Sequence, residues 1–261
     1  MSAGGEYNPK LLGIICNWCC YGGADLCGVS RLQYPPHIRL IRVMCSARVD
    51  LAHIFRAFSH GLDGVFIGGC HLNDCHYITN GNFNALGMVK ICKKLLERTG
   101  INPARLRLEW VSAGEGIRFA NIMNDFAPAI RKLGPLGSSE GMDEKTLLFK
   151  LQTASKLIPF IKLVERERLR APLKLRACSE PEKEYNKFFN SEEMNKLFDD
   201  TIADKLVINQ ITSLLRDGPL ATGEISEALS LGPSEVSRQL KVSSRHGFVR
   251  YDAGLNRFMA V

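Results

Sequence analysis

The feature that most constrains this chain is that cysteines follow its short apolar segments. The runs Leu11–Cys16, Ile38–Cys45 and Gly64–Gly69 each end in a cysteine or directly before one, Cys70. Their length and their valine and isoleucine content are typical of strands buried on both faces of a parallel sheet. A fourth run, Leu106–Val111, has the same character but no cysteine.

Helix-like segments separate these runs. In 49–60, for example, Leu51, Ile54, Phe55 and Phe58 recur at helical spacing and predict one apolar face. The alternating order βαβαβαβα predicts an α/β fold, a doubly wound, flavodoxin-like parallel sheet. The other helices are expected at 24–32, 84–99 and 115–133.

Cysteine content is unusual in both number and distribution. Seven of the nine cysteines lie in the first 75 residues. A disulfide framework is a poor explanation for a chain of this size without a secretory signal. Because the carboxyl ends of parallel strands meet at one edge of a sheet, we expect the following cysteines to converge there: Cys16, Cys19, Cys45, Cys70 and Cys75.

Convergence of thiols favours a metal site, but spacing alone leaves its type open. Structural zinc sites usually combine two Cys-x-x-Cys pairs, and here only Cys16 and Cys19 have that spacing. The irregular spacing fits a [2Fe–2S] cluster better, with zinc and a reactive dithiol as alternatives. Four glycines are expected to let backbone amides approach the sulfurs: Gly22, Gly23, Gly68 and Gly69.

The second half of the chain has a different composition. We expect one α/β domain at 1–141, a charge-rich helical connector at 142–204 and a separate domain at 205–261, with Pro159 interrupting the connector helix. In the last segment, three amphipathic helices precede a hairpin with Gly254 and Asn256 in its turn. This pattern predicts a winged helix-turn-helix.

Charge and hydropathy limit the classes of function. The formal net charge is +7, spread as +5 over 1–141 (15 basic, 10 acidic) and +2 over 205–261 (7 basic, 5 acidic), without the dense basic stripe of a dedicated nucleic-acid binder. No apolar run approaches the roughly 20 residues that span a bilayer. The start MSAGGEYNPK lacks the features of a secretory signal, so a cytoplasmic location is expected.

Four blocks of the first half resemble one known family. They read CNWCCYGGADLCG, QYPPHIRLIRVMCSARVD, AFSHGLDGVFIGGCHLNDCHYITNGN and EWVSAGEGIRFA, in this order. They resemble the delta (iron–sulfur) subunit of methyl-viologen-reducing hydrogenase, which also occurs beside formate dehydrogenases. The likeness covers about Leu11 to Gly134. Short family members end near Gly134, so the second half must be interpreted separately.

The resemblance implies a [2Fe–2S] subunit without catalysis of its own. Such subunits relay electrons between a hydrogenase, formate dehydrogenase or other dehydrogenase and the flavin- and iron–sulfur-containing subunits of a heterodisulfide-reductase-type complex that bifurcates electrons. The family cysteines correspond to the five named above, one more than a four-thiolate cluster uses. Ala47 replaces an expected glycine and Cys20 a small residue without a thiol, and neither change removes a ligand.

The winged helix leaves two functions to weigh. In a DNA-binding interpretation, Ser234, Arg238 and Lys241 would face bases and phosphates. Because +2 neutralises few phosphates, we favour docking to a protein partner and consider DNA an unlikely ligand. The main alternative is a redox-responsive DNA-binding regulator, and a weaker one is a thiol oxidoreductase using Cys16 and Cys19.

Overall fold

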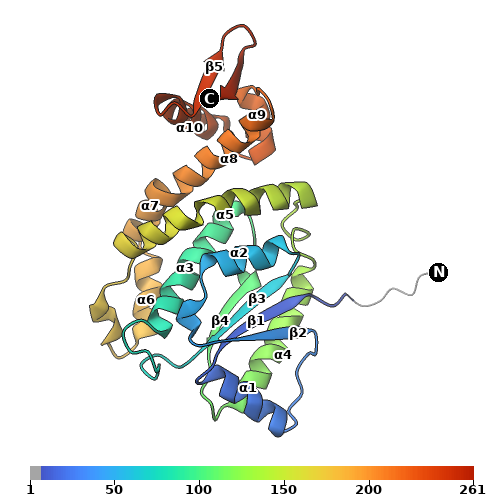
Figure 1. Cartoon of the computed structure of the whole chain (residues 1–261), viewed down its shortest axis with the longest axis vertical. Coiled ribbons are helices and arrows are strands. Elements are labelled where there is room, and N and C mark those ends of the chain that lie inside the picture. The colour runs from blue at the N-terminus through green and yellow to red at the C-terminus, as the bar shows by residue number, and fades with distance from the viewer. Residues whose placement is uncertain (1–6) are drawn as a thin grey trace, which may run out of the picture.

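A computed structural model describes residues 7–261. The segment MSAGGE, on which the expectation about a secretory signal partly rests, lies outside the described residues. The centre of the first half is a parallel sheet of four strands in the order β2-β1-β3-β4. Its strands are β1 (Leu11–Cys16), β2 (Ile38–Val43), β3 (Gly64–Gly69) and β4 (Leu106–Trp110), shown in Figure 1.

Helices cover both faces of this sheet. α1 (Cys20–Val29) and α4 (Gly116–Leu133) pack against each other on one face, while α2 (Leu51–Ser59) and α3 (Asn82–Thr99) lie on the other. Successive strand residues alternate between faces, so Ile14 joins the α2–α3 core and Ile15 the α1–α4 core. The predicted parallel α/β sheet is confirmed. Flavodoxin-like folds have a fifth strand, and the described residues form four parallel strands, so that narrower assignment stays a prediction.

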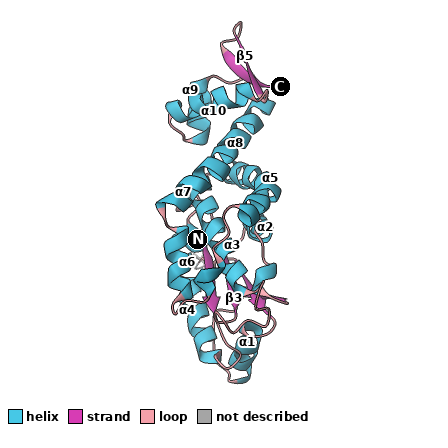
Figure 2. Cartoon of the chain, turned by 90° about the vertical axis from the view of Figure 1, so that its left-hand side faces the viewer, coloured by secondary structure: helices cyan, strands magenta, loops and turns pink. Residues whose placement is uncertain are grey.

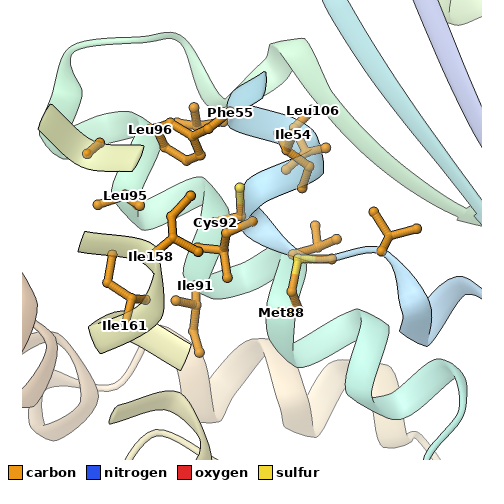
Figure 3. Packing of buried hydrophobic residues seen from close by; sticks show 14 of the residues in the cluster. Ile54, Phe55, Met88, Ile91, Cys92, Leu95, Leu96, Leu106, Ile158 and Ile161 are labelled. Carbon is orange, nitrogen blue, oxygen red and sulfur yellow. The ribbon is translucent and has the colours of Figure 1, made fainter. Parts of the chain in front are cut away.

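A long helix, α5 (Glu144–Glu167), follows the sheet domain and packs across α2 and α3. Figure 3 shows Ile158 and Ile161 of α5 beside Ile91 and Cys92 of α3, all buried in one hydrophobic cluster. The expected interruption at Pro159 is wrong, because the helix continues through it. The proline ring faces solvent, and burial of the apolar side chains on both sides outweighs the one lost hydrogen bond.

The rest of the connector returns along the same face. α6 (Pro181–Phe189) packs on α3, and α7 (Glu192–Phe198) leads through a π-helical turn at Asp199–Ala203 into α8 (Asp204–Asp217). The core that begins at Ile14 extends through this region to Leu206. The boundaries 1–141, 142–204 and 205–261 remain predictions.

The carboxyl-terminal part has its own small core and projects from one end of the molecule (Figure 2). α8 is followed by α9 (Thr222–Leu229), α10 (Pro233–Arg245) and an antiparallel hairpin of β5 (Val249–Asp252) and β6 (Arg257–Ala260). Three helices and a two-stranded wing are the elements of a winged helix-turn-helix, as predicted. Within residues 7–261, no helix is long and apolar enough to cross a membrane.

At the amino end of the sheet, a fully buried arginine joins three segments. Arg105 is 0% exposed, and its Nε donates to Glu140 Oε1 at 2.7 Å. Its other nitrogens donate to the carbonyl oxygens of Asp63, Gly134 and Pro135 at 3.0–3.1 Å. The segment that leaves α4 is therefore fixed to the sheet by a buried ion pair whose hydrogen bonds are satisfied.

Candidate metal centre

The structure brings all five predicted cysteines to the carboxyl end of the sheet. Cys16 ends β1, and Cys45 and Cys70 follow β2 and β3 closely. Relative exposure is 1% for Cys16, 3% for Cys45, 2% for Cys70 and 7% for Cys75, while Cys19 is half-buried. The topology thus gathers thiols from three separate loops, as the strand-end argument predicts.

Cys16 and Cys70 are in direct contact, with their Sγ atoms 3.6 Å apart. This contact with Cys70, together with backbone N–H groups of Cys20, Cys19 and Trp18, lowers the pKa of Cys16 to about 6, against the opposing effect of burial. The N–H of Cys20 donates to Cys16 Sγ at 3.3 Å. The same contact and burial raise the pKa of Cys70. The start of α1 thus forms a concave array of amides around one sulfur, which stabilises negative charge there.

The other three thiols lie close enough to affect this pair and one another electrostatically. Burial raises the pKa of Cys19, the charges of Cys16 and Cys75 raise it further, and Cys70 opposes the shift. Burial also raises the pKa of Cys45, as does neighbouring Cys75, while the backbone N–H of Ala47 opposes that shift. The five thiols therefore form one continuous group. Ala47, where the family resemblance leads us to expect glycine, still supplies an amide to a sulfur.

Two glycines make room for cysteine sulfurs at this end of the sheet, one for Cys20 and one for Cys75. A methyl group at Gly68 would lie 2.2 Å from Cys20 Sγ, and one at Gly81 would lie 2.3 Å from Cys75 Sγ. Gly22 and Gly23 have a different role from the expected one. A methyl group at either would meet Ala113 or Val111, so they allow α1 to approach the segment after β4.

Several residues that the sequence did not single out hold the cysteine loops in place. The Asn82 side chain, 1% exposed, donates to the carbonyl oxygens of Cys70 at 2.9 Å and His71 at 2.6 Å. Glu115 Oε2 accepts from the backbone N–H of Ser112 at 2.7 Å and contacts His71 Nε2 at 2.6 Å. Both contacts lower the pKa of Glu115, and the hydrogen bond from Ser112 has the larger effect. Both residues lie inside the quoted family blocks, which was the available signal.

The chemistry of the donor set fits an iron–sulfur cluster, because such clusters are held by cysteine thiolates. Among the side chains of residues 7–261, no group of three or more His, Cys, Asp or Glu is arranged to hold a metal ion. Ser46, beside Cys45, is 1% exposed and its hydroxyl has no hydrogen-bond partner among the described residues. A sulfide or thiolate acceptor would satisfy it. The assignment of the five cysteines as metal ligands stays a prediction.

Three other cysteines, and the aromatic residue Trp18, pack against or hydrogen-bond to the surrounding chain. Cys92 is buried in the α2–α3–α5 core, and Cys27 is buried with its thiol 3.6 Å from the carbonyl oxygen of Leu32. Cys178 Sγ donates to the carbonyl oxygen of Leu175 at 3.1 Å. Trp18 is 43% exposed and stacks on His76 with ring centroids 4.1 Å apart.

On the winged helix, the three residues proposed for docking differ in whether their side chains are already paired within the chain. Ser234 and Lys241 are exposed on α10. The Arg238 guanidinium binds Asp204 of α8 through two hydrogen bonds of 3.0 and 2.8 Å. Arg238 therefore already has an anionic partner, which neutralises its charge and leaves fewer of its donors for a phosphate.

Comparison with known proteins matches the two halves separately. Residues 11–134 match the family described as methyl-viologen-reducing hydrogenase, delta subunit. Residues 209–251 match the bacterial regulatory protein, arsR family.

Individual relatives agree with the first match. The chain is 50% identical over 130 residues to an iron–sulfur subunit of the F420-non-reducing hydrogenase of Archaeoglobus profundus, covering 50% of this chain and 94% of that protein. The vhc iron–sulfur subunit of the F420-non-reducing hydrogenase of Methanococcus voltae is also 50% identical, with 50% and 90% covered. One subunit of the ferredoxin/F(420)H(2)-dependent CoB-CoM heterodisulfide reductase of Methanosarcina acetivorans is 46% identical over the same length, which is only 16% of that larger protein.

Each of these alignments covers half of the chain, and the family match at residues 11–134 contains the converging thiols. Through that half, the chain belongs to the family of the methyl-viologen-reducing hydrogenase delta subunit.

Proposed function

We propose that this chain is an electron-transfer subunit that relays single electrons through a [2Fe–2S] cluster held by four of the five gathered cysteines. The observation that carries the proposal is the convergence of five thiols at one end of the sheet, four of them buried and Cys19 half-buried: Cys16, Cys19, Cys45, Cys70 and Cys75. Such a cluster supplies one-electron oxidation and reduction when bound.

The chain's own residues would support this role in three ways. The amides of residues 18–20 stabilise negative charge at Cys16, and that of Ala47 does so at Cys45. Asn82 and Glu115 fix the loop after β3. Burial of the thiols limits access of water, and hydrogen bonds and solvent exposure are the main protein controls on a cluster's potential.

We further propose partners on two grounds: the relatives' names point to hydrogenase and heterodisulfide reductase subunits, and the family resemblance adds the other classes. The electron donor would be a hydrogenase, formate dehydrogenase or other dehydrogenase subunit. The acceptor would be a flavin- and iron–sulfur-containing subunit of heterodisulfide-reductase type in a complex that bifurcates electrons. A cytoplasmic location and a non-catalytic role for this subunit belong to the same proposal.

Anaerobic purification of the full chain tests the cofactor. We expect a coloured protein with about two irons and two sulfides per chain, which dithionite bleaches and converts to a paramagnetic state. Five single Cys→Ser variants, one at each gathered position, should divide into four that lose most of the iron and one that retains it.

Cys178→Ser is the matched control, because Cys178 lies outside the group and should keep the full iron content. A colourless wild-type protein with one zinc per chain would contradict the proposal. So would equal iron in all six variants.

A second candidate is a redox-responsive DNA-binding regulator. The match of residues 209–251 to the arsR family and the exposed Ser234 and Lys241 on α10 favour it. The small charge of the wing domain and the pairing of Arg238 with Asp204 favour protein docking.

Gel-shift assays on genomic fragments, with the oxidised and the reduced full chain, separate these two functions. The electron-relay proposal predicts no sequence-selective shift in either state. A salt-sensitive shift that changes on reduction and is lost in Lys241→Glu would instead establish the regulator.

A further inference from the structure

The edge strand β2 differs from the other edge of the parallel sheet in its exposure and charge. Its only strand neighbour in the described chain is β1, so alternate N–H and C=O groups point outward without a strand partner. Arg39, Ile41 and Arg42 are exposed, and Ile41 is 52% exposed. On the opposite edge, β4 is half-buried and its Arg107 and Glu109 pair with each other at 2.9 Å.

Hollows flank β2 on both faces of the sheet. On the α2 side, a groove of about 440 Å³ is lined by apolar side chains of β1 and β2, including Ile14, Ile41 and Val43. On the α1 side, a second groove of about 510 Å³ is lined by Leu40, Arg42 and Tyr21, among others. Each groove receives alternate residues of the strand, because successive side chains point to opposite faces.

The surroundings of this edge are basic. Residues 26–49 include four arginines and no aspartate or glutamate. The rim of the α2-side groove carries Arg48, His53, Arg56 and His60. On the α1 side, the Arg42 guanidinium lies 4.5 Å from the centroid of the Tyr21 ring, and Asp25 is the one acidic residue of that groove.

We propose that the β2 edge is a docking site for an extended acidic segment of a partner protein, which adds as a fifth strand. Outward backbone groups of β2 would bond its main chain, while its alternate side chains enter the two grooves. Apolar residues suit the α2-side groove, and acidic residues suit Arg42 on the other side. The segment would run toward Met44 and Cys45, directly beside the thiol group.

A second copy of this chain is a poorer occupant. A second β2 edge brings the same four arginines of residues 26–49 and no aspartate or glutamate to pair with them. Pairing two such edges would gather like charges along one seam, where they repel each other. The arginines of the β2 edge therefore favour a partner segment that is negatively charged.

A labelled, end-capped peptide of four Glu-Val repeats is a direct probe, used with the purified full chain whatever its iron content. Fluorescence anisotropy should show salt-dependent binding, and hydrogen exchange should show added protection at residues 38–43. A Lys-Val peptide of equal length should not bind. The same Glu-Val peptide with alternate backbone nitrogens methylated should bind at least about tenfold more weakly. Methylation removes half of the peptide's backbone N–H groups, which are the donors that a strand pairing with β2 uses.

Paired variants locate the site. Arg42→Glu and Ile41→Asp should each weaken peptide binding by about tenfold or more. Arg250→Glu on β5 and Ile117→Asp on α4 make the same changes at exposed positions elsewhere and should leave binding within about twofold. Circular dichroism and thermal unfolding of all four would show whether each variant remains folded.

Several outcomes would overturn the proposal. One is no anisotropy change up to about 1 mM peptide, in which case the edge arginines only protect the strand from aggregation. Others are equal weakening by the control variants or unchanged protection at 38–43. A dimer that Ile41→Asp dissolves would assign the edge to a second copy. Because none of these readouts depends on iron, they are separate from the test of the cluster.

Discussion

The two ends of the parallel sheet differ in how far the chain itself satisfies their buried polar groups. At the amino end, Arg105 and Glu140 are buried, and hydrogen bonds from the chain itself satisfy them. At the carboxyl end, five thiols and the hydroxyl of Ser46 are held together with few partners other than each other. The same sheet thus has one end that is complete without a ligand and one whose donor groups would be satisfied by one. Energetic tests should separate them.

The largest effect is expected at the amino end. Arg105→Ala should lower the free energy of unfolding by about 3–5 kcal/mol, because it leaves the Glu140 carboxylate buried without its partner. Chemical denaturation of the full chain measures this change. Arg98→Ala removes an exposed ion pair with Asp199 and serves as the control, with an expected loss below about 1 kcal/mol. Equal losses in both variants would mean that burial does not distinguish these pairs.

A smaller effect is expected where β3 meets Cys20, at the start of α1. Gly68→Ala would place a methyl group 2.2 Å from the sulfur of Cys20, which is buried and has little space to move. Overpacking of this kind should cost about 1–3 kcal/mol of unfolding free energy. In contrast, Gly28→Ala adds a methyl group to α1 where no atom lies within 4 Å, and it should stabilise the chain by about 0.5–1 kcal/mol. A Gly68→Ala variant as stable as wild type would show that the thiol end can rearrange freely.

The smallest effect concerns pH at the amino end. Burial pushes the pKa of Glu140 upward, but the hydrogen bond and charge of Arg105 outweigh it and hold that pKa below its ordinary value. A carboxyl group with a lowered folded-state pKa stabilises the fold above its unfolded-state pKa, and this contribution is lost as pH falls through the folded-state value.

Wild type should therefore lose unfolding free energy more steeply than Glu140→Gln as pH falls from about 5 to about 3. Denaturation midpoints at several pH values, converted to free energies, give the two slopes. Parallel curves for the two proteins would show that Glu140 makes no pH-dependent contribution.

Local pattern predicted the frame of the cysteine domain well. The bounds of β1 and β3 coincide with the apolar runs Leu11–Cys16 and Gly64–Gly69, because buried parallel strands are continuous in sequence. The convergence of the thiols followed from topology alone. The amide array around Cys16 was not foreseen, since it depends on how α1 begins.

Features made by distant segments escaped sequence reasoning. Arg105 looks like an ordinary surface arginine until residues 63 and 134–140 surround it. Pro159 looks like the end of a helix, because the packing of Ile158 and Ile161 on α3 is not visible in the local sequence. In both cases, the deciding free energy comes from residues far away along the chain.

The packing of α5 on α2 and α3 also bears on how this protein could be dissected. The match to the delta subunit family stops at residue 134, and the Archaeoglobus profundus relative is little longer than the 130 residues that align. A fragment cut there would have the length of such a relative, yet it would leave bare the side of α3 that Ile158 and Ile161 now cover. The end of the family match at residue 134 therefore does not coincide with the end of the hydrophobic core, which continues into α5. Domain exchange at that point would require redesign of the α3 surface.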